Sequence, residues 1–477
     1  MINQKEKMDT ICAIATPAGG ALGIIRVSGP EAITAADRIF RPRVGAPLSQ
    51  RAASSLTFGN VVVPQTDEAV DEVLVSLFRS PHSYTGEDSV EFSCHGSYYI
   101  LNKVVELLLA QGCRMARPGE YTERAFLNGK MDLSQAEAVA DLIASTTEAN
   151  HRMAMQQMRG GFSKELRTLR DQLLHITSLL ELELDFSDHE ELEFASRPEL
   201  LALAERIRSH ISGLCQSFRL GNALKRGVPV ALVGETNAGK STLLNALVGE
   251  ERALVSNVHG TTRDTIEETV NVGGTLVRFI DTAGIRETSD TVERMGIERT
   301  FDKMAEADIV LWLIDLTVYQ AQYNELAEKI GAQVQGKQLV VLLNKTDLVS
   351  ESTINEAKQY ISGQLNNAVP TPMLLTLSAQ SGSGLDQLKQ LLAASLSTLQ
   401  AENNSTGTIV SNLRHYEALS AALAATDRVI EGLHQGLSGD FVSQDLRECI
   451  YHLSDIVGEV TTDQVLGNIF KHFCVGK

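Results

Sequence analysis

The chain has 477 residues, of which 43% are hydrophobic and 21% charged. This composition is typical of a globular protein that buries full cores, and the length indicates two or three domains. The formal net charge of −18 argues against a protein that coats nucleic acid, because affinity for polyanions comes largely from lysine and arginine.

The first residues, MINQKEKMDT, are polar and lack the apolar core of a secretory signal. The longest apolar runs fall far short of the ~18 residues that a membrane helix needs. We therefore expect a cytoplasmic protein without membrane contact. The six cysteines are scattered, with no C-x-x-C pair, so neither a disulfide framework nor a zinc site is predicted.

Residues 1–127 predict an N-terminal α/β domain. Short strand-like runs (ICAIAT, LGIIRVSG, VDEVLVSLF and SVEFSCHG) are separated by glycine and proline, and YYILNKVVELLLAQG has the apolar period of a helix. In residues 128–225 the period becomes helical throughout, which predicts long packed helices. The acidic run at 181–193 is expected to be a solvated helix end and loop rather than a binding tail.

Strands and helices alternate in residues 226–398, which predicts a mostly parallel sheet with helices on both faces. Helical periodicity returns in residues 399–477. Because this last part is too small to fold alone, we expect it to pack on the helices that precede Arg226. The sheet domain would then be an insertion in a discontinuous helical domain.

The segment VALVGETNAGKSTLLNAL carries a phosphate-binding pattern. Gly234, Gly239, Lys240 and Ser241 fit G-x-x-x-x-G-K-[ST], and a strand and a helix flank them as the mechanism requires. Backbone N–H groups of such a loop point at phosphate oxygens, and the lysine adds charge. The alternative is an incidental glycine-rich turn. The nucleotide-binding residues expected here are Asn237, Ala238, Gly239, Lys240, Ser241 and Thr242.

Two segments further along predict the groups that sense the γ-phosphate. VRFIDTAG places Asp281 and Gly284 after an apolar strand, where they suit a magnesium-linked carboxylate and a backbone donor. Thr262 in VSNVHGTTRDT would complete the magnesium shell with Ser241, unless this is a threonine-rich loop without a ligand. The other expected contacts in these segments are Gly260, Thr282 and Ala283.

LVVLLNKTD predicts recognition of guanine. A carboxylate only accepts hydrogen bonds, so Asp347 can receive the paired N–H edge of guanine, and adenine offers no equivalent. Lys345 would lie on the ring beside Asn344, and the backbone at Ser378 and Ala379 would donate to the guanine carbonyl. The alternative is a polar loop at a strand end.

Taken together, GETNAGKSTLLNAL, GTTRD, DTAGIRETSDTVERMGIER and NKTD resemble the MnmE (TrmE) family of tRNA-modification GTPases. The likeness extends to ATPAGGALGIIRVSG, SYTGEDSVEFSCHG, RPGEYTERAFLNGKMDLSQAEAVADLI and the terminal FCVGK, so it covers essentially the whole chain. It implies three parts: an N-terminal folate-binding and dimerisation domain, the helical domain, and an inserted Ras-like P-loop GTPase domain.

The resemblance also implies how GTP is hydrolysed. Ile285 stands where many GTPases have a water-holding glutamine, and the family uses a glutamate that aligns with Glu293; the alternative is an ordinary surface glutamate. With Lys240 on the phosphates, a potassium ion would replace an arginine finger. Its implied ligands are Asn237, Ser256, Val258 and Thr261. The chain departs from the commonest family loop at Glu235 and Thr236.

In the N-terminal domain the resemblance implies a bound tetrahydrofolate derivative, 5-formyl- or methylene-tetrahydrofolate. The residues that match its pocket are Arg26, Glu91, Lys130 and Lys477, which from spacing alone would be surface ion pairs and a frayed terminus. Cys474 is either a functional thiol near the folate or a buried cysteine.

The implied reaction adds a carboxymethylaminomethyl or aminomethyl group to C5 of the wobble uridine of certain tRNAs. The chain has no strand-linked G-x-G-x-x-G for a flavin or nicotinamide, so the family's flavoprotein MnmG (GidA) would supply the redox chemistry to a homodimer of this chain. The alternative function is a regulatory GTPase switch in ribosome or RNA assembly, which would have no use for the N-terminal domain or the CVGK end.

Overall fold

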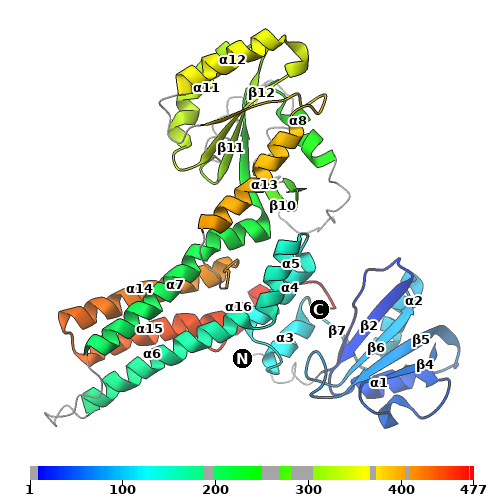
Figure 1. Ribbon diagram of the computed structural model, residues 1–477. Helices are drawn as coiled ribbons and strands as arrows, with labels where there is room; N and C mark the ends of the chain where they lie inside the picture. The colour runs from blue at the N-terminus through cyan, green and yellow to red at the C-terminus, as the bar shows by residue number, and fades with distance from the viewer. Residues whose placement is uncertain are drawn as a thin grey trace. The chain divides into compact units, whose positions relative to one another are not determined.

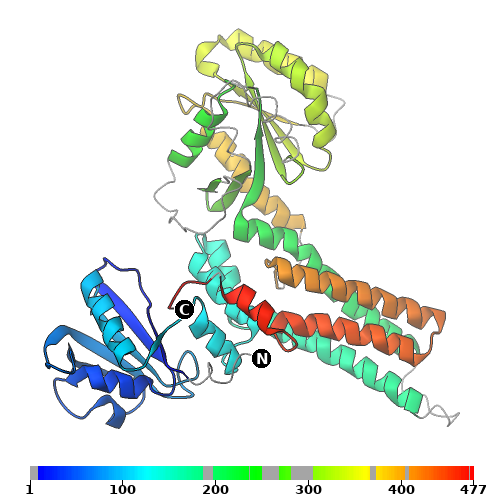
Figure 2. The same ribbon diagram turned by 180° about the vertical axis from the view of Figure 1, so that it is seen from behind.

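A computed structural model describes residues 9–185, 197–235, 237–249, 268–280, 304–365, 372–402, 408–471 and 473–476 (Figure 1, Figure 2). The chain forms two compact units. The first comprises Met1–Ala140, Gln156–Leu179 and Leu446–Lys477, and the second Asp141–Met155 and Leu180–Asp445. The domain boundaries expected at 127, 225 and 398 stay predictions.

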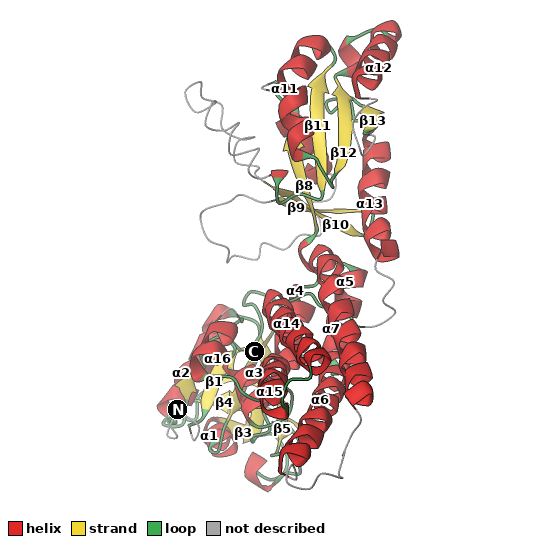
Figure 3. Cartoon of the chain, turned by 90° about the vertical axis from the view of Figure 1, so that its left-hand side faces the viewer, coloured by secondary structure: helices red, strands yellow, loops and turns green. Residues whose placement is uncertain are grey.

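The first unit contains a seven-stranded sheet in the order β3-β4-β5-β6-β2-β1-β7. Neighbouring strands are antiparallel except β1 and β7, which are parallel. The strands are β1 (Ile11–Ile14), β2 (Leu22–Ser28), β3 (Phe40–Pro42), β4 (Ser55–Val62), β5 (Ala69–Phe78), β6 (Ser89–His95) and β7 (Arg114–Met115). Figure 3 shows them in yellow. The four strands expected from the sequence correspond to β1, β2, β5 and β6.

One face of this sheet carries the core. Val75, Val90 and Phe92 are fully buried there against α1 (Ala32–Ile39) and α2 (Tyr98–Ala110). Each such side chain contributes roughly 1.5–3 kcal/mol by leaving water. Because side chains alternate along a strand, the residues between them point to the opposite face. The α2 helix was expected from its period; α1, β3, β4 and β7 were not.

The C-terminal helix α16 (Asp463–Phe470) packs on the helices that follow the sheet, α3 (Glu120–Leu127) and α4 (Leu133–Ala144). Gly119, with φ of 69°, begins α3, and a Cβ atom at this position would lie 2.7 Å from the carbonyl oxygen of Phe470. The close approach therefore requires glycine.

A buried ion network holds α3 to the sheet. The Glu120 carboxylate, 2% exposed, accepts from Arg114 at 2.7 Å and from Arg124 at 3.1 Å, and both arginines also bind Asp9. Burial by itself would raise the pKa of Glu120, but the hydrogen bonds from Arg114 and the Arg117 backbone lower it to about 2. The network is therefore most stable with this carboxylate charged.

We expect Glu120→Gln to lower the free energy of unfolding at pH 7 by roughly 2 kcal/mol, because the buried Arg124 and the partly exposed Arg114 lose a charged partner. The folded-state pKa lies below the usual 4.5, so this stabilisation is present above pH 4.5 and disappears as the pH falls toward 2. Urea unfolding followed by circular dichroism from pH 7 to pH 2.5 tests this. Glu106→Gln, which changes an exposed ion pair with Lys103, is the control and should have little effect at any pH. If the difference in the free energy of unfolding between the parent and Glu120→Gln stayed constant from pH 7 to pH 2.5, the charged Glu120 carboxylate would not be what stabilises the network.

The second unit contains a six-stranded sheet in the order β13-β12-β11-β8-β10-β9. All neighbours are parallel except β9 and β10. The strands are β8 (Val228–Val233), β9 (Glu268–Val272), β10 (Thr275–Ile280), β11 (Ile309–Asp315), β12 (Gln338–Asn344) and β13 (Met373–Thr376). The expected mostly parallel sheet is confirmed.

Helices cover both faces of this sheet, as expected from the alternating pattern. Apolar residues of α8 (Lys240–Gly249) and α13 (Leu385–Glu402) join one core, and those of α11 (Tyr319–Gln333) and α12 (Glu351–Leu365) join the other. The central strands β8, β11 and β12 are buried almost throughout, which is why they read as continuous apolar runs in the sequence.

The long helices α7 (Arg197–Arg226) and α14 (Leu413–Gln435) pack together in the second unit. The rings of Phe218 and Tyr416 stack with centroids 4.4 Å apart. The expectation that C-terminal helices pack on those before Arg226 is thus confirmed for α14. The other helices are α5 (Glu148–Met158), α6 (Gly161–Asp185) and α15 (Gly439–Val457). Among the described helices, none is both long and apolar enough to cross a membrane.

Candidate functional site

The phosphate-binding pattern forms a tight loop between β8 and α8. Gly239 has φ of 101° and Asn237 has φ of 62°, both in the left-handed region, and the Ala238 N–H donates to the Glu235 carbonyl. The Lys240 ammonium folds back over the loop and donates to the carbonyls of Gly234 at 2.6 Å and Glu235 at 2.7 Å. The loop therefore has the shape that directs backbone N–H groups and a lysine at phosphate oxygens.

Asn344 ties this loop to the guanine-side residues. It ends β12, is 2% exposed, and its Nδ2 donates to the Ala238 carbonyl at 2.7 Å. Its Oδ1 accepts from the Ala379 N–H at 3.0 Å. The side chain thus uses both of its polar atoms to join the phosphate loop to the turn after β13. From sequence we expected Asn344 beside the base; its contacts in the structure make it a clamp between two loops.

Lys345 and Asp347 follow Asn344 in a short turn. Lys345 has φ of 66°, and Asp347 lies in the 3-10 helix η3 (Thr346–Leu348), where it is exposed. The turn after β13 is held by the Ser378 N–H, which donates to Ser383 O at 2.9 Å. The expected guanine-binding residues are therefore on two turns that Asn344 holds together.

Asp315 is a site residue that the sequence analysis missed. Its Oδ2 accepts from Lys345 Nζ at 2.6 Å, and its Oδ1 accepts from the Thr317 N–H and hydroxyl. Burial would raise the pKa of Asp315, but the hydrogen bonds from Lys345 and Thr317 lower it, so it stays charged. Asp315 pairs in register with Asn344 at the carboxyl ends of β11 and β12, the edge where ligands bind in such sheets. An acidic residue at the end of an apolar strand was the signal that could have revealed it.

At Glu235 the chain departs from the commonest family loop. The Glu235 side chain lies beside Glu325 and Gln322 of α11. Burial and the neighbouring Glu325 carboxylate raise the pKa of Glu235, against the opposing effects of Gln322 and Lys240. Gln322 also accepts from the Asp315 N–H at 2.8 Å, so it joins the two acidic positions. The acidic side chain is thus accommodated by a neighbouring helix.

Several expected site residues lie outside the described part of the chain. They are Ser256, Val258, Gly260, Thr261, Thr262, Asp281, Thr282, Ala283, Gly284, Glu293 and Lys477. The described members of the nucleotide set are on the loop and the two turns above.

A second candidate site surrounds Arg26 in the first unit. Arg26 and Glu91 face each other on β2 and β6, and Arg26 Nε donates to Glu91 Oε1 at 2.8 Å. The guanidinium lies 5.4 Å from the ring centroid of Tyr84 and 5.5 Å from that of Tyr121. Both distances fit cation–π contacts. The two tyrosines were not identified from the sequence, because nothing in their spacing relates them to Arg26.

The C-terminal tail reaches this site. Arg26 Nη1 donates to the Gly476 carbonyl at 3.4 Å, and the Cys474 carbonyl accepts from the Gly119 N–H at 3.3 Å. Cys474 is exposed, which contradicts the buried-cysteine alternative. Lys130 donates to the Pro81 carbonyl, whereas Glu91 is paired with Arg26. Arg26, Glu91 and the tail before Lys477 are therefore brought together.

Comparison with known proteins covers nearly the whole chain. Residues 10–130 match the family model of the GTP-binding protein TrmE N-terminus, and residues 133–474 match that of the MnmE helical domain. A protein of Bacteroides fragilis (strain YCH46) named tRNA modification GTPase MnmE is 58% identical over 470 residues, 98% of this chain and 99% of that protein.

Proteins of the same name in other organisms agree. One in Bacteroides thetaiotaomicron is 58% identical over 473 residues (98% of this chain, 99% of that protein), and one in Flavobacterium johnsoniae is 48% identical over 481 residues, all of both chains. Because a family model spans residues 133–474 and such relatives match nearly end to end, this chain belongs to the MnmE (TrmE) family.

Proposed function

We propose that this chain is a GTP hydrolase acting in tRNA modification. The observation that carries the proposal is the clamp made by Asn344, which joins the phosphate loop at Ala238 to the turn at Ala379. A single buried side chain thereby sets the spacing between a triphosphate site and a guanine site. The relatives that share this chain's full length are named tRNA modification GTPases.

Within this site the described residues have separate tasks. Lys240 and the N–H groups of Asn237 to Thr242 bind the phosphates, and Asp347 accepts the N–H edge of guanine. The pairing with Asp315 holds the Lys345 stem against the base, while Ser378 and Ala379 present backbone donors. Asp315 is thus a positioning residue.

Magnesium and potassium fit the residue types of this loop. Ser241, at the start of α8, would hold Mg²⁺ with Thr262, with Asp281 linked to it less directly; Mg²⁺ neutralises charge on the phosphates. Asn237 offers a neutral amide oxygen, and its left-handed backbone at φ 62° turns the loop at this residue. Asn237 would hold K⁺ with Ser256, Val258 and Thr261, and K⁺ would offset charge between the β- and γ-phosphates.

We expect GTP turnover by the purified protein to fall by about 10²-fold or more when potassium is replaced by sodium, the range found when one charge-stabilising group is lost. The smaller sodium ion fits poorly among ligands spaced for potassium. Steady-state phosphate release at constant ionic strength measures the effect, with GTP binding as the control. Equal turnover in the two salts would contradict the potassium site.

Glu293 orients the attacking water in this proposal, in place of the glutamine that Ile285 excludes. We expect Glu293→Ala to bind GTP as the parent does and to hydrolyse it about 10²–10⁴-fold more slowly, the usual contribution of a general base. Single-turnover hydrolysis of prebound GTP separates the two effects. Glu306→Ala, which changes a carboxylate in the same stretch of chain, is the control. If Glu293→Ala hydrolysed GTP at the parent rate, another residue would have to orient the attacking water.

The N-terminal site suits a folate. Arg26 donates to Glu91 and so holds its carboxylate, which can receive the donor edge of a pterin, while Lys130 and Lys477 suit the glutamyl carboxylates. Lys130, Lys477 and the exposed thiol of Cys474 complete the proposed set. A 5-formyl- or methylene-tetrahydrofolate there would supply the one-carbon unit for a carboxymethylaminomethyl or aminomethyl group on C5 of the wobble uridine. The flavoprotein MnmG would supply the redox step.

We also propose a homodimer through the N-terminal sheet in the cytoplasm. The face opposite α1 and α2 exposes three large apolar residues of β4 and β5: Leu56 at 62%, Phe58 at 40% and Leu74 at 41%. Phe58 and Leu74 are paired across the strands, so they form one patch. A second copy of the chain would cover it by the same surface, as expected for a two-fold dimer.

Mass spectrometry of tRNA nucleosides tests the function. Cells that lack this chain should lose the modified wobble uridine, and the parent gene should restore it. Arg26→Met should fail to restore the modified uridine while retaining GTP hydrolysis in vitro, because Arg26 belongs to the proposed folate site and is not among the residues proposed to bind GTP. Arg41→Met, a change at an exposed arginine of β3, should restore it fully. Unaltered modification in cells without the chain would favour the assembly-switch alternative.

A further inference from the structure

Two cysteines of the first unit form a thiol pair that the proposed GTPase and folate chemistry do not use. Cys12 lies on β1 and Cys113 directly precedes β7, the strand parallel to it. Cys12 pairs in register with Met115, so Cys113, two residues earlier, is on the same face of the sheet. Both side chains belong to the same buried cluster, which α1 and α2 cover.

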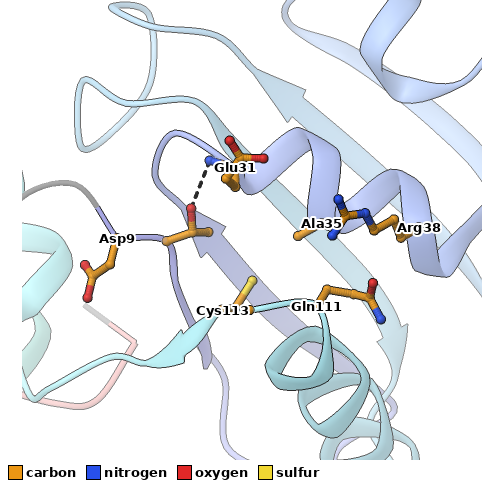
Figure 4. A pocket seen from close by; sticks show the side chains of 8 residues that line it. Asp9, Glu31, Ala35, Arg38, Gln111 and Cys113 are labelled. Atoms are coloured by element: carbon orange, nitrogen blue, oxygen red, sulfur yellow. Dashed lines mark hydrogen bonds between the residues drawn. The ribbon is translucent and has the colours of Figure 1, made fainter.

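Cys113 lines a pocket of about 270 Å³ between the residues that precede β1, the helix α1 and the segment that follows α2. Figure 4 shows its sulfur directed toward α1, the helix that carries Ala35. Cys113 is 7% exposed, whereas Cys12 behind it is completely buried. A small reagent in the pocket would therefore reach Cys113 first.

The volume of the pocket favours a small reagent. Among its charged residues, Glu31 and Arg38 carry opposite charges, and the Asp9 carboxylate is already paired with Arg114 and Arg124. Glutathione disulfide is large for this volume, whereas a hydroperoxide is small.

The two neighbouring thiols are unequal. The Cys12 side chain lowers the pKa of Cys113, although burial opposes this, and the Cys113 side chain together with burial raises the pKa of Cys12. The thiolate is the nucleophile in thiol chemistry, so Cys113 is the attacking member and Cys12 is the proton-bearing neighbour. Cys94 in the same sheet is a contrast, since burial raises its pKa to about 12.

We propose that Cys113 and Cys12 form an oxidant-sensitive site in which a hydroperoxide entering this pocket closes a disulfide between β1 and the segment before β7. With hydrogen peroxide, the Cys113 thiolate attacks one oxygen and the O–O bond breaks. Hydroxide leaves and takes up the proton that Cys113 lost, which gives a sulfenic acid on Cys113 and one water. The Cys12 sulfur then attacks the Cys113 sulfur. Water leaves with the Cys12 proton, so two thiols are oxidised and one peroxide is reduced to two waters.

Hydrogen peroxide acting on the full-length, folded protein tests the proposal. After treatment with a few equivalents and alkylation of the remaining thiols, a tryptic digest without reductant should contain peptide 8–26 joined to peptide 104–114, lighter than their sum by two hydrogens. Dithiothreitol should separate them. Dimedone should label Cys113 about tenfold more than Cys94, because few Cys94 thiols are ionised.

Variants separate the two roles and control for misfolding. Cys12→Ser and, in case a buried hydroxyl disturbs the fold, Cys12→Ala should leave Cys113 trapped as its dimedone adduct. Cys113→Ser should abolish the joined peptide, and Cys94→Ser should keep it. The proposal is overturned if the exposed Cys474 is oxidised while no joined peptide forms. It is also overturned if the same pair forms equally in protein unfolded by urea, because the folded geometry would then have no part.

Discussion

Asp347→Asn is expected to lower kcat/KM for GTP on the order of 10⁴-fold and to raise it for xanthosine triphosphate. A site built to receive two N–H groups discriminates by about this factor, because an unmatched polar group is left without its partner. The amide presents N–H where guanine also presents N–H. Xanthine carries an oxygen in place of the amino group, so an amide can donate to it.

The structure makes this substitution a clean test. Asp347 is exposed on its short helix and is not part of the Asn344 clamp, so the change should leave the fold intact. Steady-state hydrolysis of both nucleotides measures the ratio. Glu351→Gln, an exposed carboxylate in the first turn of α12, is the matched control and should leave the ratio unchanged. An Asp347→Asn variant that still prefers GTP would remove Asp347 from base recognition.

The nucleotide half of the site could be predicted well because its groups come from single local patterns. A strand, a glycine loop and a helix start lie within eighteen consecutive residues, and Asn344 ends a buried strand that Lys345 and Asp347 directly follow. Local chemistry therefore identified the residues. It could not show that Asn344 reaches back to Ala238, because that bond joins residues that are 106 positions apart.

Asp315 shows where prediction from the sequence stops. Its partner Lys345 directly follows a different strand, and the pairing exists because β11 and β12 are neighbours in register. Strand order cannot be read from periodicity, which only indicates that strands exist. The same limit applies to Arg26 and Glu91: both were identified, but their pairing depends on β2 lying beside β6, with three strands between them in the chain.

The C-terminal tail is the most distant case. Gly476 lies beside the end of β1, and a Cβ atom there would be 2.6 Å from the carbonyl oxygen of Ile14. Nothing in the composition of the last residues indicates this contact, since a short tail after a helix usually frays. Only the family resemblance related the tail to Arg26, and the structure supplies a physical reason for its glycine.

Gly239→Ala is expected to weaken GTP binding by about 10²–10³-fold. Gly239 has φ of 101°, a conformation that costs other residues roughly 1–3 kcal/mol. A Cβ atom would also lie 2.3 Å from Asn344 Nδ2, so Asn344 would have to move and release the Ala238 carbonyl. Losing a buried hydrogen bond of this kind costs about 1–3 kcal/mol more. Both costs fall on the loop shape that binds phosphate.

Gly249→Ala, at the other end of α8, is the matched control. Among the described residues, nothing outside the backbone of α8 lies within 4 Å of the Cβ position there, so alanine fits and should even favour the helix by up to about 1 kcal/mol. Titration with a fluorescent GTP analogue, beside thermal unfolding by circular dichroism, distinguishes a lost site from a lost fold. If Gly239→Ala bound the analogue as tightly as Gly249→Ala, the clamp between Asn344 and Ala238 would not be what shapes the phosphate loop. The central observation behind the proposed activity would then lose its force, because the distance between the guanine and triphosphate sites would be set by something other than that side chain.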